Sequence, residues 1–301
     1  RSLIDVVQTY PQMRDLRRRM MSGYLHGSSY SPIDVAELRQ RLPPLTGGGP
    51  NSRLPIIGAM VHEEAAVCRH DGVAWGYARS ASSRGVEIHQ HTEVKSLLRD
   101  NDGTIKGVET NRGTVLADKV AVVVSGHTTT ITQTAGLRLP VKSFNLAAFV
   151  SEPVKPLINV IVNCPDLGVY LNQSDKGELV IGGAPDPGQS FRRDMKQNVF
   201  EDAVVNMLEL FPAFRRLKLL RQWGGVLDIA HDATPIISTT DIPGLFVSCG
   251  WWGGFKAVPA GGYSLAHLIA TGQPHNIAAP FTLDRFRHLD FIVESGTTTA
   301  R

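Results

Sequence analysis

Two short runs of apolar residues, each of which stops at a glycine, constrain the fold more than any other feature of the sequence. Residues 120–124 read Val-Ala-Val-Val-Val and stop at Ser125-Gly126, and residues 245–249 read Leu-Phe-Val-Ser-Cys and stop at Gly250. Continuous apolar runs of this length are typical of strands that are buried on both faces, as in parallel α/β sheets. Because such sheets bind ligands at the carboxyl ends of their strands, both glycine-containing ends are candidate sites.

The second run continues into a glycine-rich turn and then a helix. The turn, Gly-Trp-Trp-Gly-Gly-Phe-Lys at residues 250–256, precedes a helix that we expect from about Gly261 to Ala270, closed by Gly272. A strand, a glycine-rich turn and a helix in this order can direct backbone N–H groups at an anion. The glycine spacing is not that of a dinucleotide or P-loop motif, so a tight turn without a ligand stays an alternative.

The first third of the chain predicts mainly helices. Residues 1–45 carry apolar residues at helical spacing and predict two helices, the second led by Pro32. Asp71 is expected to cap a further helix that ends at Gly85, with Ala74, Trp75 and Ala78 as its buried stripe.

Patterns of period two follow after Gly85. Strands are expected at residues 86–91, 94–98 and 104–110, with a hairpin turn at residues 101–103, which together form a small antiparallel meander. Further strand signals at residues 144–150, 159–162, 169–171 and 178–183 predict a second sheet, and residues 198–210 predict an amphipathic helix. The pattern indicates a mixed α/β fold with more than one sheet.

Composition excludes several classes of protein. The 301 residues are 42% hydrophobic and 20% charged, which is ordinary for a globular chain, and 31 basic against 28 acidic residues leave a formal charge of only +3. That balance argues against nucleic-acid binding and against a polybasic membrane anchor. No stretch approaches the ~18 to 20 apolar residues of a membrane span. The three cysteines lie far apart, so we expect no disulfide scaffold, no structural metal and a cytoplasmic protein.

A few polar residues are candidates for chemistry. The ammonium of Lys256, beside a backbone cradle, suits a carboxylate or an anionic reduced ring, although a solvated lysine is the alternative. His70 lies at a helix start, which disfavours its protonated form and leaves a nucleophilic imidazole, although a surface histidine is the alternative. His89 and His91 lack a third ligand, so we assign no metal site. Capping of a turn accounts for Asp232.

Taken together, these segments resemble the flavin-dependent amine oxidases of the D-amino acid oxidase-like family. The similar stretches are residues 69–75, 113–126, 222–226, 232–237, 249–256 and 264–269, and they cover most of the chain after about residue 55. His70 in its Arg-His-Asp setting and the Cys-Gly-Trp that opens the last turn are most similar to the β subunits of heterotetrameric sarcosine oxidases.

The resemblance implies roles for individual residues. It implies that His70 holds FMN covalently and that Lys256 binds the carboxylate of the substrate. Val94 and Gly126 match positions near the adenosine half of a non-covalently bound FAD. The cofactor-binding turn beside the isoalloxazine ring matches Gly250, Gly253, Gly254 and Phe255.

The resemblance also implies a domain organisation. An FAD-binding, Rossmann-like domain is expected from residues 55–140 and 225–290, interleaved with an antiparallel-sheet substrate and interface domain from residues 1–54 and 141–224. The family opens with a strand, a Gly-x-Gly-x-x-Gly turn and a helix that hold the FAD pyrophosphate, and residues 1–50 contain no match to it. We therefore expect this chain to lack its first flavin-binding segment and to bind FAD weakly on its own.

The function that the resemblance implies is oxidation of an N-methyl amino acid, sarcosine, to glycine and a one-carbon unit. Electrons would pass from FAD to FMN and then to oxygen. The implied partners are an α subunit, with FMN at the interface, and smaller subunits, one of which passes the one-carbon unit to tetrahydrofolate. Two alternatives stay open: a non-catalytic or truncated subunit that keeps the fold without FAD, and an oxidase of another secondary amine, such as an opine or proline.

Overall fold

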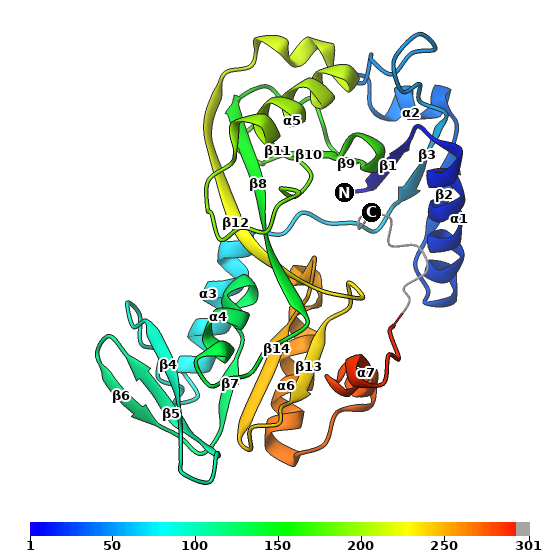
Figure 1. Cartoon of the computed structure of the whole chain (residues 1–301). Helices are drawn as coiled ribbons and strands as arrows, with labels where there is room; N and C mark the ends of the chain where they lie inside the picture. Colours follow the sequence, from blue (N-terminus) through cyan, green and yellow to red (C-terminus); the bar gives the residue numbers. More distant parts are fainter. Residues whose placement is uncertain (293–301) are drawn as a thin grey trace.

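The structure, a computed structural model, describes residues 1–292 and contains two regions built on separate sheets (Figure 1). The larger region holds an eight-stranded sheet in the order β12-β8-β11-β10-β9-β1-β3-β2. Its strands are β1 (Leu3–Val7), β2 (Tyr30–Ile33), β3 (Gly58–His62), β8 (Val141–Pro153), β9 (Ile161–Cys164), β10 (Val169–Gln173), β11 (Glu178–Gly182) and β12 (Leu219–Ala230). All neighbours pair antiparallel except β1 and β9, so the predicted second sheet is confirmed and extends further than the sequence indicated.

Helix α5 (Gln197–Leu210) forms where the amphipathic pattern predicted a helix, and it covers the large sheet (Figure 1). Ala203, Met207 and Leu210 on its buried face join a core cluster with Phe149 of β8 and Phe211, which follows the helix. The large apolar side chains at this centre are almost completely removed from water, and burial of each stabilises the fold by roughly 1.5 to 3 kcal/mol. This core keeps β8 and the neighbouring strands in place.

Residues 1–45 were expected to contain two helices only, and the structure corrects this expectation. Helices α1 (Tyr10–Leu25) and α2 (Val35–Arg41) are present, but strands β1 and β2 precede them. β1 is rich in β-branched residues and lies inside the sheet between β3 and β9, where burial outweighs helical spacing. Pro32 lies in the edge strand β2 rather than in a helix, and Asp34 caps α2 by accepting a hydrogen bond from the Glu37 amide.

The smaller region contains two parallel strands at the two apolar runs. Only the second run is buried throughout; the first strand ends at Val122, and Val123 and Val124 are 55% and 45% exposed, which corrects the expectation of a strand buried on both faces. β7 (Val120–Val122) pairs parallel with β14 (Leu245–Cys249), and β13 (Ile236–Thr239) pairs antiparallel with β14 on its other side. Helix α6 (Val258–Thr271) follows the glycine-rich turn, and Gly272 ends it in the left-handed conformation, as expected. A second sheet of β4 (Val94–Arg99), β5 (Ile105–Thr110) and β6 (Gly113–Leu116) and the short helices α4 (Thr128–Gln133) and α7 (Asp284–Arg287) complete the region.

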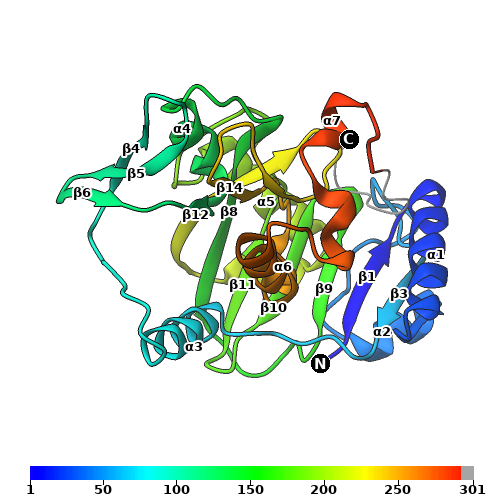
Figure 2. The same cartoon turned by 90° about the horizontal axis from the view of Figure 1, so that it is seen from below.

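Two expectations between residues 70 and 91 are wrong. Helix α3 (His70–Ser82) forms, but none of its residues is buried, and Trp75 is 57% exposed, so the predicted buried stripe faces solvent. Seen from below, α3 stands apart from the sheets at the side of the molecule (Figure 2). Residues 86–91 form no strand, because no strand within residues 1–292 pairs with their alternating pattern. The third strand of the meander is β6 instead.

Strands β8 and β12 connect the two regions. They pair along nearly their whole length, from the large sheet down to the smaller region, where Ser143 lies opposite Asp228 (Figure 1). β12 as a whole and β3 belong to the large sheet, whereas the expected boundaries at residues 54/55 and 224/225 separate β3 and half of β12 from it. The lower end of β12 therefore brings the large sheet to the carboxyl ends of β7 and β14.

Candidate functional site

The turn that follows β14 is held in a conformation that requires glycine. Gly250 has a φ of +74°, and a Cβ atom there would approach the Ala230 side chain to 2.8 Å. A Cβ on Gly254 would lie 2.7 Å from the Cβ of Trp251. Both glycines are therefore needed for the close packing of the turn against β12 and Trp251, before any ligand is considered.

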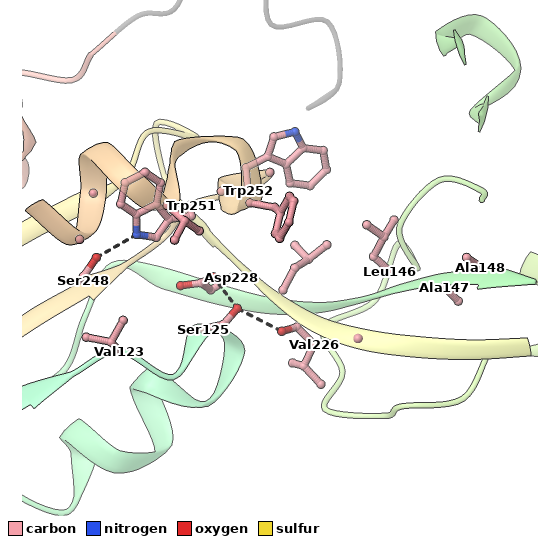
Figure 3. A pocket seen from close by; sticks show the side chains of 18 of the residues that line it. Val123, Ser125, Leu146, Ala147, Ala148, Val226, Asp228, Ser248, Trp251 and Trp252 are labelled. Carbon is pink, nitrogen blue, oxygen red and sulfur yellow. Dashed lines mark hydrogen bonds between the residues drawn. The ribbon is translucent and has the colours of Figure 1, made fainter. Parts of the chain in front are cut away.

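A cavity of about 670 Å³ lies beside this turn (Figure 3). Its walls come from the carboxyl ends of β7 and β14, from the middle of β8 and β12, from Tyr170 of β10 and from the first half of α6. The volume is within the range of pockets that bind small molecules and cofactors. The cavity thus lies where the first apolar runs placed it, at the carboxyl ends of the parallel strands.

The cavity is apolar and aromatic, with few charged groups. Trp223, Trp251, Trp252 and Phe255 line it with Tyr170, and burial raises the pKa of the Tyr170 phenol. Gly225 and Gly262 also line it, and a Cβ built on either would have no heavy atom within 4 Å. At Gly225 and Gly262 the cavity wall is therefore bare backbone with free space in front of it. A flat, aromatic ligand suits such a lining.

Asp228 is the carboxylate of this site, and sequence reasoning did not identify it. It is only 2% exposed and lines the cavity from β12. Its Oδ1 accepts a hydrogen bond from the Ser125 hydroxyl at 3.0 Å, and its Oδ2 accepts one from the Gly250 amide. Ser125 also lies 3.3 Å from the Val226 carbonyl oxygen (Figure 3). The sequence around Asp228 does not reveal that β12 pairs with β8, so nothing in the sequence indicated that Asp228 lies at the cavity.

Tyr170 and Trp223 were also missed. Tyr170 alternates with the buried Val169 and Leu171 of β10, so its position on the opposite face was open to prediction. Which face lines the cavity depends on the order of the strands, and that order was not apparent from the sequence.

Gly126 is packed against β12 at the end of β7. A Cβ on Gly126 would lie 2.3 Å from Cγ1 of Val226, and its carbonyl oxygen accepts a 2.6 Å hydrogen bond from the Ser143 hydroxyl. Gly126 therefore sits directly behind Ser125, which lines the cavity. Of the predicted cofactor-binding set, Gly253, Gly254 and Phe255 line the cavity, whereas Gly126 and Gly250 pack against β12 beside the lining residues Ser125 and Trp251.

Lys256 lies on the other side of the same turn. Its side chain is exposed, and its Nζ donates a 3.0 Å hydrogen bond to the Gly253 carbonyl oxygen. It lines a neighbouring hollow of about 330 Å³, which shares residues Trp251 to Gly254 with the main cavity. Residues 251–254 thus border both spaces, and the ammonium group of Lys256 lies at the smaller one.

His70 and Val94 lie elsewhere. His70 is the first residue of α3, as expected, and its side chain is exposed. Next to it, Arg69, Asp71 and Trp75 contribute to a shallow hollow of about 390 Å³, and the hydrogen bond from Arg69 lowers the pKa of Asp71. Val94 is the half-buried first residue of β4 and pairs with Thr110. Neither residue lines the main cavity.

Two features are absent from the part of the chain that is described. Across residues 1–292, no three His, Cys, Asp or Glu side chains gather as metal ligands would. Among the helices of the same residues, none has both the length and the apolar character that crossing a bilayer demands.

Comparison with known proteins adds a family and several relatives. Residues 3–268 match the family model described as "FAD dependent oxidoreductase". The chain is 42% identical over 296 residues to a protein named "Sarcosine oxidase subunit beta" from Rhodobacter capsulatus, covering 98% of this chain and 70% of that protein. A protein of the same name from Rhizobium meliloti is 40% identical, with 98% and 71% coverage.

Solved structures show the same fold at lower identity. L-proline dehydrogenase from P. horikoshii superposes with a TM-score of 0.84 at 22% identity, over 95% of this chain and 76% of that one. Glycine oxidase from Geobacillus kaustophilus superposes with a TM-score of 0.82, also at 22% identity, over 94% and 74%. At this identity the likeness concerns the fold.

Proposed function

The chain belongs to the FAD-dependent oxidoreductase family and is a flavin-dependent amine oxidoreductase, and we propose that it oxidises an N-methyl amino acid, sarcosine. One observation of the site carries this proposal: a single glycine-rich turn borders a large aromatic cavity on one side and presents Lys256 on the other. That turn can serve a flat cofactor and a small carboxylate together. The proposal that the substrate carries an N-methyl group rests on the names of the relatives, which are sarcosine oxidase subunits.

The residues around the cavity fit the flavin ring of FAD. Gly225 and Gly262 leave open space in its walls, and the surrounding side chains are aromatic. When bound, FAD supplies the two-electron acceptor of the reaction. Strand β1 and helix α1 are joined by Gln8 and Thr9 rather than by glycines, so a pyrophosphate cradle is not found at this strand-to-helix junction.

The chain itself binds and orients the substrate. We propose that Lys256 exchanges its hydrogen bond with the Gly253 carbonyl oxygen for a charged bond to the substrate carboxylate. Loss of a hydride from the methyl carbon and a proton from the nitrogen leaves an imine, which water hydrolyses to glycine and a one-carbon unit.

The finer assignments are proposals of the same kind. We propose that FMN is attached to His70, because its exposed imidazole lies at a helix start and beside a hollow that contains arginines. The exposed face of α3 would then meet an α subunit, and the relatives, named as β subunits, support an assembly of several chains. We also propose that Val94 lies near the adenosine half of bound FAD. A cytoplasmic location is proposed because the three cysteines are unpaired.

The test is spectroscopic. Because this chain is expected to bind FAD weakly on its own, FAD is added in excess, and the absorption bands of the bound flavin are followed. Anaerobic sarcosine should bleach these bands, whereas glycine, which lacks the N-methyl group, should not. Proline and an opine in the same assay separate the substrate proposal from the wider class of secondary amines. Colourless protein that takes up no added FAD would instead support the non-catalytic subunit.

A further inference from the structure

Asp228 joins two turns that are far apart in the sequence and adjacent at the cavity. We infer that Asp228 is a positioning residue, which fixes the turn at residues 125–126 and the turn at residues 250–252 relative to each other. Its two carboxylate oxygens are used separately, one for each turn. The role in catalysis rests on the proposed function, whereas the fastening of the turns does not.

Two side chains of the large sheet hold the first turn. Asp228 of β12 accepts the Ser125 hydroxyl, and Ser143 of β8, which lies opposite Asp228 in the ladder, donates to the Gly126 carbonyl oxygen. Ser125 adopts a φ of +48°, a conformation that is unfavourable for a residue with a side chain. The two hydrogen bonds hold the turn in this conformation from above.

The second turn is held by both the side chain and the backbone of Asp228. The Gly250 amide donates to the carboxylate, and the Trp252 amide donates to the Asp228 carbonyl oxygen at 3.0 Å. Trp252 also has a positive φ, of +52°. A bridge between Ile229 and Trp251 continues this contact. Two unfavourable conformations, one in each turn, thus depend on a single residue of β12.

This arrangement explains why a buried carboxylate is tolerated in an apolar wall. An unpaired carboxylate there would be costly, but both oxygens of Asp228 have donors. Loss of the Asp228 carboxylate would therefore release both turns, whereas loss of the Ser125 hydroxyl would release only the first. In the proposed enzyme, Asp228 would act through Ser125 and the 250–252 backbone on a cofactor that it need not touch.

The test compares backbone amide exchange in four variants. Asp228→Leu removes both bonds at similar volume, Asp228→Asn keeps a neutral acceptor, and Ser125→Ala removes one arm. The matched control is Asp5→Leu, because Asp5 is also 2% exposed but lies in β1 and accepts from Asn163. Exchange is measured in peptides that cover residues 123–127 and 249–255, relative to the rest of the chain.

Asp228→Leu should raise exchange at both turns by at least about tenfold, the factor equivalent to ~1.4 kcal/mol. Asp228→Asn should raise it by about fivefold at residues 249–255, since a charged acceptor binds more strongly than a neutral one. Ser125→Ala should act on residues 123–127 alone, and Asp5→Leu on neither turn. If Asp228→Leu does not fold, the Asn and Ala variants decide: turn exchange at the wild-type rate in both would overturn the inference.

A spectroscopic measurement tests whether Asp228 positions the bound cofactor. In flavin-loaded protein, Asp228→Asn should change the visible circular dichroism of the bound flavin, while Asp5→Asn should leave it as in the wild type. A spectrum unchanged by Asp228→Asn, despite loosened turns, would remove the positioning role. Wild-type protein that takes up no added FAD would contradict the proposed function, and the exchange data would still decide whether Asp228 fastens the turns.

Discussion

Arg285 and Asp232 form a bidentate ion pair in which both side chains are almost completely buried. Nε of Arg285 lies 2.8 Å from Oδ2 of Asp232, and Nη2 lies 3.0 Å from Oδ1. Nη2 also donates to the Thr234 carbonyl oxygen, and the Ile292 amide donates to the carboxylate. The pair thus fastens helix α7 and the residue that ends the described chain to the loop between β12 and β13.

Removal of one partner should destabilise the fold strongly. Arg285→Met leaves a buried carboxylate without its cation, which typically costs about 3 to 5 kcal/mol. Denaturant unfolding measures the change as a lower midpoint. Arg287→Met is the control, because Arg287 pairs with Asp241 at the surface, where an ion pair contributes ~1 kcal/mol or less. Equal midpoints for the two variants would show that the buried pair contributes no more to the free energy of unfolding than the surface pair does.

The same pair predicts a dependence of stability on pH. Burial of Asp232 opposes its ionisation, but the hydrogen bonds and charge of Arg285 outweigh burial, so its pKa lies below the ordinary 3.8. The ionised carboxylate therefore stabilises the fold above pH 3.8, and this contribution is lost as the pH falls through the lower, folded-state pKa. Unfolding free energies of wild type and Asp232→Asn should differ by a constant amount near neutral pH and converge in acid. A constant difference throughout would contradict the assignment.

Two adjacent glycines of α6 provide a test of the cavity as the flavin site. A Cβ at Gly262 meets no atom, so Gly262→Ala should keep or raise stability, by up to ~1 kcal/mol, yet fill space that the flavin would occupy. Gly261→Ala would place a Cβ 2.6 Å from the ring of Trp251 and should destabilise the fold itself. Melting temperature and flavin affinity are measured for both. Undiminished flavin affinity in Gly262→Ala would place the ligand elsewhere.

Lys256 should control the affinity for carboxylates. In flavin-loaded protein, Lys256→Met should weaken sarcosine and simple carboxylate inhibitors by at least about tenfold, because a charged hydrogen bond contributes roughly 1.5 to 3 kcal/mol. Methionine keeps the apolar stem, so the flavin should stay bound and coloured. Inhibitor titration followed by absorbance gives the affinities. If they match the wild type, Lys256 keeps its bond to Gly253 and is not a substrate ligand.

His70 should determine whether flavin remains on the denatured chain. Wild-type protein is expected to retain covalently bound flavin after acid precipitation, and His70→Ala to retain none. Because the side chain is exposed at a helix end, the melting temperature should change little. His89→Ala, at another exposed histidine, is the control and should behave as wild type. Flavin that stays attached to the His70→Ala chain would exclude this residue.

The sequence predicted the elements whose determinants are local. The apolar run at residues 245–249, the glycines after it and the helix closed by Gly272 each act on near neighbours, and all are confirmed. The ion pair of Asp232 was not foreseen, because Arg285 is 53 positions away and nothing local distinguishes it from other arginines. Capping of the turn at Asp232 was foreseen, and its Oδ1 does accept the Thr234 amide.

The site followed the same division. The Gly250 to Phe255 segment was visible because missing side chains mark a turn, whereas Asp228 and Tyr170 gained their positions from strand order. The prediction that one face of α3 is buried was wrong for a related reason. Apolar spacing predicts a face that favours a partner, but no element within residues 1–292 packs on it.

The pairing of β7 with β14 implies an order of events during synthesis. All of β8 to β12 lies between these two strands in the chain, whereas the large sheet is complete once β12 has been made. On the ribosome, the eight-stranded sheet can therefore form while β7 still lacks its neighbour. The cavity closes only after β14 and α6 have emerged, so a ligand enters an architecture whose larger half is already folded.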